Sequence, residues 1–217
     1  MKLSKKNIAL QAEKLLEKLY PDAECSLTYE TPLQLLIATR LSAQCTDKRV
    51  NIVTKDLFSK YKSVYDFKEA KEEDIADCIK SCGLYKTKAR DIKLMAEKII
   101  SDYEGQVPDT LEKLLTLPGV GRKTANLIMG DVYGKPAVVT DTHCIRISGR
   151  LGLTENTDPK KVEFDLLKLL TPETSSDFCH RIVLFGREYC RARNPLCFNC
   201  PLKEICKENK NGKKTVR

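Results

Sequence analysis

Apolar residues recur at helical spacing along nearly the whole chain. The first such stripe comprises Ile8, Ala12, Leu15, Leu16 and Leu19. A spacing of three or four residues places side chains on one face of an α-helix. Alternation typical of strands is scarce, and KPAVVT at 135–140 is the only β-like stretch. The pattern therefore predicts an all-α fold.

Later stripes support this prediction. They comprise Ile75, Cys78 and Ile79; then Ala89, Ile92, Leu94, Met95, Ile99 and Ile100; then Val162, Leu166, Leu167 and Leu170. Gly83 is expected as the C-cap that ends the first of these, and Asp158 with Pro159 is a typical start for the last. Residues 133–136 (YGKP) break the helical pattern and are expected to link two lobes. The charged tail after Cys206 is expected to be a frayed terminus that can touch phosphates.

Composition indicates a globular protein with an anionic partner. Of the 217 residues, 41% are hydrophobic and 31% are charged, and the net charge is +8. That excess of Lys and Arg suits nucleic acid. Aromatics are only 6% and Trp is absent, which argues against a stacking-rich single-strand binder. No apolar run is long enough to cross a membrane, and the N-terminus lacks the features of a signal peptide, so we expect the prokaryotic cytosol or nucleoid.

Cys190, Cys197, Cys200 and Cys206 form a C-x6-C-x2-C-x5-C array. In a reducing compartment, clustered cysteines bind metal more often than they form disulfides. Four thiolates at this spacing can hold one zinc ion or an iron–sulfur cube. The other six cysteines are scattered and are expected mostly as small buried residues.

The segment LPGVGRKTA predicts a turn followed by a helix N-terminus. Its glycines allow a tight turn, and unpaired N–H groups with the positive dipole end favour an anion there. Pro118, Gly119, Val120, Gly121 and Arg122 are therefore predicted to grip a DNA phosphate without reading sequence. A nucleotide P-loop fails on spacing, so no nucleotide cofactor is expected. A plain helix–turn–helix corner is the alternative.

Lys123 and Asp141 are the candidate chemical groups. A lysine in the first turn of a helix meets the positive dipole end, which disfavours the protonated amine and favours a nucleophile. The alternative for Lys123 is a solvated surface lysine. Asp141 precedes a helical run, where an N-cap is its plain role. Its second role would be a carboxylate facing positive charge that develops on a sugar.

Five stretches occur together in order: LSAQCTDKRVN at 41–51, GLYKTKA at 83–89, LPGVGRKTAN at 117–126, TDTH at 140–143, and the cysteine array at 190–206. Together they resemble the endonuclease III family of DNA glycosylases, which belongs to the helix-hairpin-helix superfamily. The resemblance implies a two-lobed α fold. Residues 25–135 would form a six-helix lobe with the hairpin, and residues 1–24 plus 136–217 a lobe in which the four cysteines hold a [4Fe–4S] cluster.

The resemblance also implies an activity on damaged double-stranded DNA. The family removes oxidised pyrimidines and then nicks the strand by β-elimination. Lys123 would attack C1′ with help from Asp141, while Gln44 and Leu84 would fill the space left by the flipped base. A helix-start polar residue and a core leucine are the alternatives for these two. His143 would contact the DNA backbone or serve as a structural histidine.

Several other functions remain open from sequence. One is a mismatch-specific glycosylase relative, which Lys123 and the short C-terminal region argue against. Another is a non-catalytic iron–sulfur DNA-binding module, which would need neither Lys123 nor Asp141. A ferredoxin-like electron carrier fits the basic charge poorly. We expect a monomer, because a cleft enzyme can hold a duplex alone.

Overall fold

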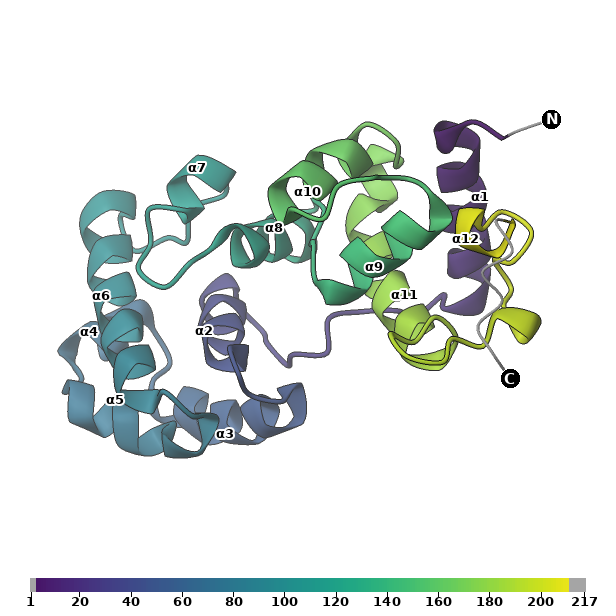
Figure 1. Cartoon of the computed structure of the whole chain (residues 1–217). Helices are drawn as coiled ribbons and strands as arrows, with labels where there is room; N and C mark the ends of the chain where they lie inside the picture. Colours follow the sequence, from purple (N-terminus) through teal and green to yellow (C-terminus); the bar gives the residue numbers. More distant parts are fainter. Residues whose placement is uncertain (1–2, 211–217) are drawn as a thin grey trace. The chain divides into compact units, whose positions relative to one another are not determined.

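The computed structural model describes residues 3–210, and every regular element in that part is helical. The prediction of an all-α fold is confirmed. The chain divides into two compact units, one comprising Met1–Glu24 and Gly134–Arg217 and the other Cys25–Tyr133. Figure 1 colours the elements of both units in chain order.

The unit Cys25–Tyr133 is built around one long helix. Its elements are α2 (Pro32–Ser42), α3 (Asp47–Lys60), α4 (Val64–Glu69), α5 (Glu72–Cys78), the 3-10 helix η1 (Lys80–Cys82), α6 (Tyr85–Tyr103), α7 (Leu111–Leu114) and α8 (Arg122–Asp131). Helix α6 packs against α4, α5 and α2, and Ile92, Met95 and Ile99 are buried on its inner face. Side-chain caps fix the starts of α2, α3 and α4, as expected for Thr and Ser at these positions.

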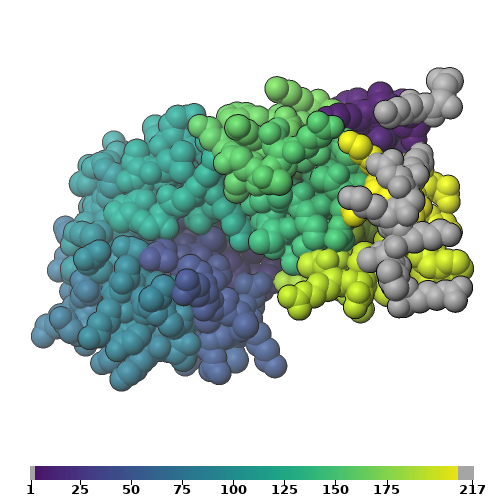
Figure 2. Space-filling view, in the orientation of Figure 1, coloured from purple at the N-terminus to yellow at the C-terminus, as the bar shows by residue number. Residues whose placement is uncertain are grey.

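The other unit is organised around α11. Its elements are α1 (Lys5–Leu19), α9 (Thr142–Leu151), α10 (Pro159–Leu167), η2 (Pro172–Thr174), α11 (Ser175–Glu188), η3 (Cys197–Asn199) and α12 (Lys207–Lys210). Helix α11 packs against both α1 and α9, with Phe178, Ile182 and Phe185 buried. Helix α1 thus joins a unit that otherwise comes from the C-terminal part of the chain. In the space-filling view of Figure 2, this N-terminal helix (purple) borders the C-terminal segment (yellow).

The predicted stripes become helices, with differences in detail. In α1, Ala12 and Leu16 are buried, but Leu15 and Leu19 are exposed. Glu13 is buried on that inner face instead, where its carboxylate accepts hydrogen bonds from the backbone N–H of Thr171 and from two threonine hydroxyls. A buried carboxylate that is fully hydrogen-bonded is tolerated, but hydrophobic spacing alone does not reveal it.

Other local predictions have mixed outcomes. Asp158 caps α10 through its side chain and Pro159 begins the helix, as predicted. Gly83 ends η1 rather than α5, because η1 continues the chain beyond Cys78. The β-like residues 135–140 are buried at Ala137–Val139 without forming a strand. Of the predicted tail, residues 207–210 form α12, and residues 211–217 lie outside the described part. Among the described residues, no helix combines the length and apolar character needed to cross a membrane.

Candidate active site and cysteine site

The predicted turn joins α7 to α8 through a glycine in the left-handed region. Gly119 has φ +74°, and the N–H of Val120 donates to the carbonyl of Leu117 at 3.1 Å. A Cβ at Gly119 would stand 2.7 Å from Nε of Arg40 and 3.1 Å from Oδ2 of Asp91. Both the backbone angle and the close neighbours therefore require glycine here.

Arg40 and Asp91 support the turn from beneath. Their side chains are 15% exposed each, with the guanidinium 2.6 Å from the carboxylate and a second contact from Nε at 2.8 Å. This ion pair, with two contacts between α2 and α6, fixes the side chains that lie directly against Gly119.

Helix α8 begins immediately after the turn and has no side-chain cap. Its N-cap is Gly121 with φ −96°, an ordinary extended angle. A Cβ at Gly121 would meet nothing within 4 Å, so the approach to the first turn is open. Uncapped N–H groups at the positive end of a ten-residue helix are suited to an anion.

The candidate nucleophile, Lys123, is the second residue of α8. Its side chain is exposed, whereas Ala125 and Asn126 just beyond it are buried. Pro118 and Arg122 are partly buried, and Val120 is buried at 9% exposure. The structure thus places Lys123 in the first turn of α8, next to backbone N–H groups that no side chain caps.

Asp141 and His143 belong to the other unit. Asp141 is the N-cap of α9, and its Oδ1 accepts from the N–H of Cys144 at 2.7 Å. Its Oδ2 lies 3.3 Å from Nδ1 of His143. The predicted N-cap is confirmed, and Oδ2, which takes no part in the cap, faces His143.

A glycine of α11 makes room for that histidine. A Cβ at Gly186 would stand 2.5 Å from Cδ2 of His143. The ring is held between α11 and the carboxylate of Asp141, with 25% of the side chain exposed. Asp141 and Lys123 thus belong to different units of the chain.

Gln44 and Leu84 share an unusual backbone conformation. Gln44 has φ +56° and Leu84 has φ +48°, and both are exposed, Leu84 at 56%. Such angles in residues with a Cβ cost about 1–3 kcal/mol each and cluster at functional sites. Neither alternative from sequence fits, since Gln44 lies in the α2–α3 loop and Leu84 is not in the core.

The two loops are close to each other. A Cβ at Gly83 would lie 4.0 Å from the carbonyl oxygen of Gln44. The structure therefore brings Gln44 and Leu84 to neighbouring loop tips within one unit. Sequence patterns could not indicate this, because left-handed angles are expected at Gly or Asn and not at Gln or Leu.

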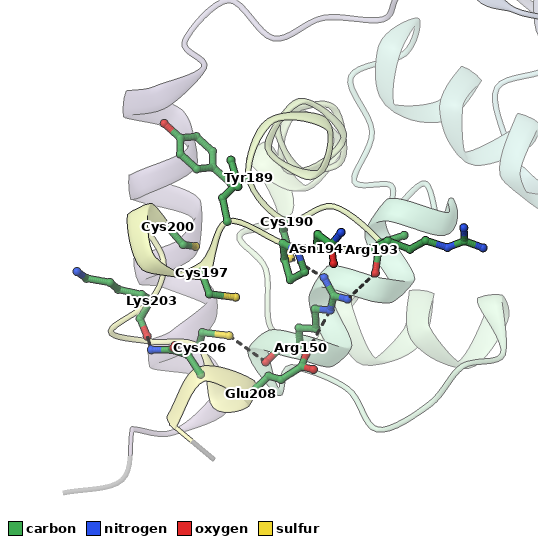
Figure 3. Close-up of a pocket in the computed structure, with 14 residues that line it drawn as sticks. Arg150, Tyr189, Cys190, Arg193, Asn194, Cys197, Cys200, Lys203, Cys206 and Glu208 are labelled. Carbon is green, nitrogen blue, oxygen red and sulfur yellow. Dashed lines mark hydrogen bonds and ion pairs between the residues drawn. The ribbon is translucent and has the colours of Figure 1, made fainter. Parts of the chain in front are cut away.

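The four cysteines of the array line a single open cavity of about 700 Å³. Figure 3 shows the sulfur atoms of Cys197, Cys200 and Cys206 extending from the C-terminal loop toward Cys190. In residues 3–210, no three His, Cys, Asp or Glu side chains are placed to hold one metal ion. Four thiols around one cavity are a donor set that suits either a zinc ion or an iron–sulfur cluster.

Arginines of α9 fix the loop that carries these cysteines. Arg150 donates to Sγ of Cys190 at 3.4 Å and to the carbonyl of Arg191 at 2.8 Å, and its own carbonyl accepts from Sγ of Cys206 at 3.4 Å. Arg146 donates to the carbonyl of Cys190 at 3.0 Å. Neither arginine is predictable from the sequence, because an arginine inside a helix gives no sign of its partner.

Comparison with known proteins places the chain in a class. The family of HhH-GPD superfamily base excision DNA repair proteins matches residues 37–172. An endonuclease III of Synechocystis sp. is 47% identical over 204 residues, covering 94% of this chain and 93% of the relative.

Two solved structures extend the likeness to the fold. A trapped endonuclease III–DNA covalent intermediate, an estranged-adenine complex, has a TM-score of 0.88 at 42% identity, covering 97% of this chain and 99% of that one. A thermostable thymine-DNA glycosylase has a TM-score of 0.85 at 26% identity, covering 95% and 98%. The chain belongs to the endonuclease III family of the HhH-GPD superfamily, and the resemblance predicted from its motifs is confirmed.

Proposed function

We propose that this protein is a base-excision-repair DNA glycosylase and abasic-site lyase that removes oxidised pyrimidines from double-stranded DNA. The observation that carries the proposal is Lys123, exposed on the uncapped first turn of α8 directly after the glycine turn. The 42% identical relative was trapped as a covalent intermediate with DNA, which supports a nucleophile in this fold. We propose a nucleoid location because the substrate is DNA.

Lys123 acts as the nucleophile. Its Nζ lone pair forms a bond to C1′ of the deoxyribose, while the C1′–N bond to the base breaks and the base leaves with that electron pair and a proton. Opening of the sugar gives an imine between Lys123 and C1′. The imine acidifies the C2′ proton, and its loss breaks the C3′–O bond and releases the 3′ phosphate.

Asp141 is proposed to assist this chemistry with its carboxylate. It accepts the proton that Lys123 must lose, and its negative charge stabilises the positive charge that develops on the sugar. Its Oδ1 is fixed by the N–H of Cys144, so the orientation of the carboxylate is set before substrate binds. His143, beside Oδ2, is proposed to contact the DNA backbone near the lesion.

The remaining residues hold the duplex. The segment Pro118, Gly119, Val120, Gly121 and Arg122 binds a phosphate through the backbone N–H groups at the start of α8 and through positive charge, while Pro118 and Val120 shape the turn. Flipping a base out of the stack costs a few kcal/mol and leaves a gap. Gln44 and Leu84 are proposed to fill that gap, which suits their exposed positions on adjacent loops.

Cys190, Cys197, Cys200 and Cys206 are proposed to hold a [4Fe–4S] cluster. Their donor set is four thiols around one cavity, with arginines that hydrogen-bond to the sulfur and backbone of the loop. When bound, the cluster supplies a rigid, charged structural centre. Arg191, Arg193 and Lys203, which are exposed on this loop, then present a fixed basic surface to DNA phosphates.

These roles imply a division of labour between the lobes. Residues 25–135 carry the hairpin, Lys123 and the two gap-filling residues, and residues 1–24 with 136–217 carry Asp141 and the cluster site. We propose that one copy of the chain suffices, because it contributes every residue named above.

The test is borohydride trapping on duplex DNA that contains thymine glycol, with the wild type beside Lys123→Ala. A covalent protein–DNA band from the wild type alone would support the lyase mechanism and the role of Lys123. Absence of a band from both proteins, with duplex binding retained, would instead favour a non-catalytic binding module or a mismatch-specific relative such as the thymine-DNA glycosylase class.

A further inference from the structure

Lys88 of α6 is fully buried, which is unusual for a lysine. Its ammonium group donates to three backbone carbonyls, those of Leu41 at 2.8 Å, Ala43 at 2.7 Å and Cys82 at 2.7 Å. An ammonium has three N–H donors, so this set satisfies all of them. Burial lowers the pKa of Lys88, so the charged contacts form against a desolvation cost and need a structural reason.

The carbonyls that Lys88 binds lie next to the two gap-filling residues. Ala43 immediately precedes Gln44, and Cys82 lies two positions before Leu84. The backbone N–H of Lys88 also donates to the carbonyl of Leu84 at 3.0 Å. One residue therefore holds the α2–α3 loop and the η1–α6 loop together.

The turn that carries Gln44 needs such support. Ala43 has φ −58° and ψ 113°, Gln44 has φ +56°, and the N–H of Cys45 donates to the carbonyl of Ser42. These values match a type II turn, in which the third residue is usually glycine. A glutamine there persists only when its surroundings fix the backbone.

We propose that Lys88 is a positioning residue that sets the left-handed backbone of both Gln44 and Leu84, so that the two side chains enter the gap left by the flipped base together. This inference rests on the proposed function. A prearranged pair loses less conformational freedom on binding DNA than two mobile loops would. Removal of the ammonium group would free the loops while leaving Lys123 unchanged.

Lys93 offers a matched control on the same helix. Its ammonium also donates to two backbone carbonyls, those of Lys68 at 2.8 Å and Ala70 at 2.7 Å. It ties α6 to the C-terminal end of α4, which carries none of the proposed site residues. Lys93→Met therefore removes a similar contact without touching the gap-filling loops.

The experiment compares wild type, Lys88→Met, Lys88→Gln and Lys93→Met on two substrates. The first is a thymine glycol duplex in single-turnover excision, with 2-aminopurine opposite the lesion to report local unstacking. The second is a single-stranded abasic oligonucleotide in borohydride trapping, where there is no opposite strand and no gap to fill. Circular dichroism melting of each variant reports folding.

We expect Lys88→Met to lose about tenfold or more in duplex excision and to lose the 2-aminopurine signal, while single-strand trapping stays within about twofold. Lys88→Gln, which keeps two N–H donors, should fall between wild type and Lys88→Met. Lys93→Met should match wild type on both substrates.

Equal duplex rates for Lys88→Met and Lys93→Met would overturn the proposal. So would equal losses by Lys88→Met on both substrates, or failure of both Lys88 variants to fold, since either result assigns Lys88 to general stability. Failure of the wild type to trap on the single strand would instead refute the lyase function itself. This outcome is separate from a failure of the Lys88 proposal, because it appears in the protein with Lys88 intact.

Discussion

Gly119→Ala tests whether the hairpin turn depends on its close packing against the Arg40–Asp91 ion pair. The substitution puts a Cβ at φ +74°, which costs a residue other than glycine about 1–2 kcal/mol. The new atom would also stand 2.7 Å from Nε of Arg40, so the guanidinium must move away from Asp91. Disturbing an ion pair whose partners are 15% exposed adds about 1–3 kcal/mol. The expected loss is therefore about 2–5 kcal/mol, or a fall in Tm on the order of 10 °C.

The assay is thermal and urea unfolding of Gly119→Ala beside Gly121→Ala. Gly121 is the matched control, because its φ is −96° and a Cβ there meets nothing within 4 Å. Gly121→Ala should change the free energy of unfolding by less than about 1 kcal/mol. The same small change for Gly119→Ala would show that Arg40 moves aside without cost and would refute the reasoning.

Two further predictions concern charge. Asp141→Asn keeps an oxygen that accepts the N–H of Cys144, so the free energy of unfolding should change by less than about 1 kcal/mol. Borohydride trapping should fall at least about tenfold, because the negative charge is lost. Equal trapping by Asp141→Asn and wild type would contradict the role of the carboxylate. Burial raises the pKa of the Cys25 thiol to about 12 and that of Cys82 to about 11. The folded state holds these protons where the unfolded thiols, with pKa near 9.0, release them, so stability should be fully present below pH 9 and fall as pH rises toward the folded pKa values. Urea unfolding across this pH range should show that the free energy of unfolding falls less steeply with pH for Cys25→Ala than for wild type. An equally steep fall for both proteins would count against the explanation.

Sequence patterns predicted the parts of this protein that follow local rules. Helical spacing gave the helices, and Asp158 and Asp141 were predictable caps because a short acceptor before a helix satisfies a free N–H. The glycine turn was predictable because only glycine readily takes the angle at Gly119.

Long-range contacts were not predictable in this way. The buried side chains of Lys88 and Glu13 break the usual rule for charged residues, and their most distant partners lie 47 and 161 positions away. The left-handed angles at Gln44 and Leu84 run against the residues' own preferences, so local sequence patterns do not predict them. The four cysteines were recognisable from their spacing, but the arginines that bond to their loop come from α9.

The division of the chain into Cys25–Tyr133 and the two flanking segments also sets the order in which the protein can fold on the ribosome. Helix α1 precedes the other described helices in synthesis, yet α11, against which it packs, follows about 155 residues later. At translation rates of about 5–20 residues per second, that delay is about 8–30 s. The unit Cys25–Tyr133 can complete its own core during this time. Ala9, Ala12 and Leu16 of α1 have no α11 to pack against until then. Helix α1 is therefore among the last of the described helices to dock, and the nascent chain must keep its apolar stripe exposed until the loop with the four cysteines is about to be made.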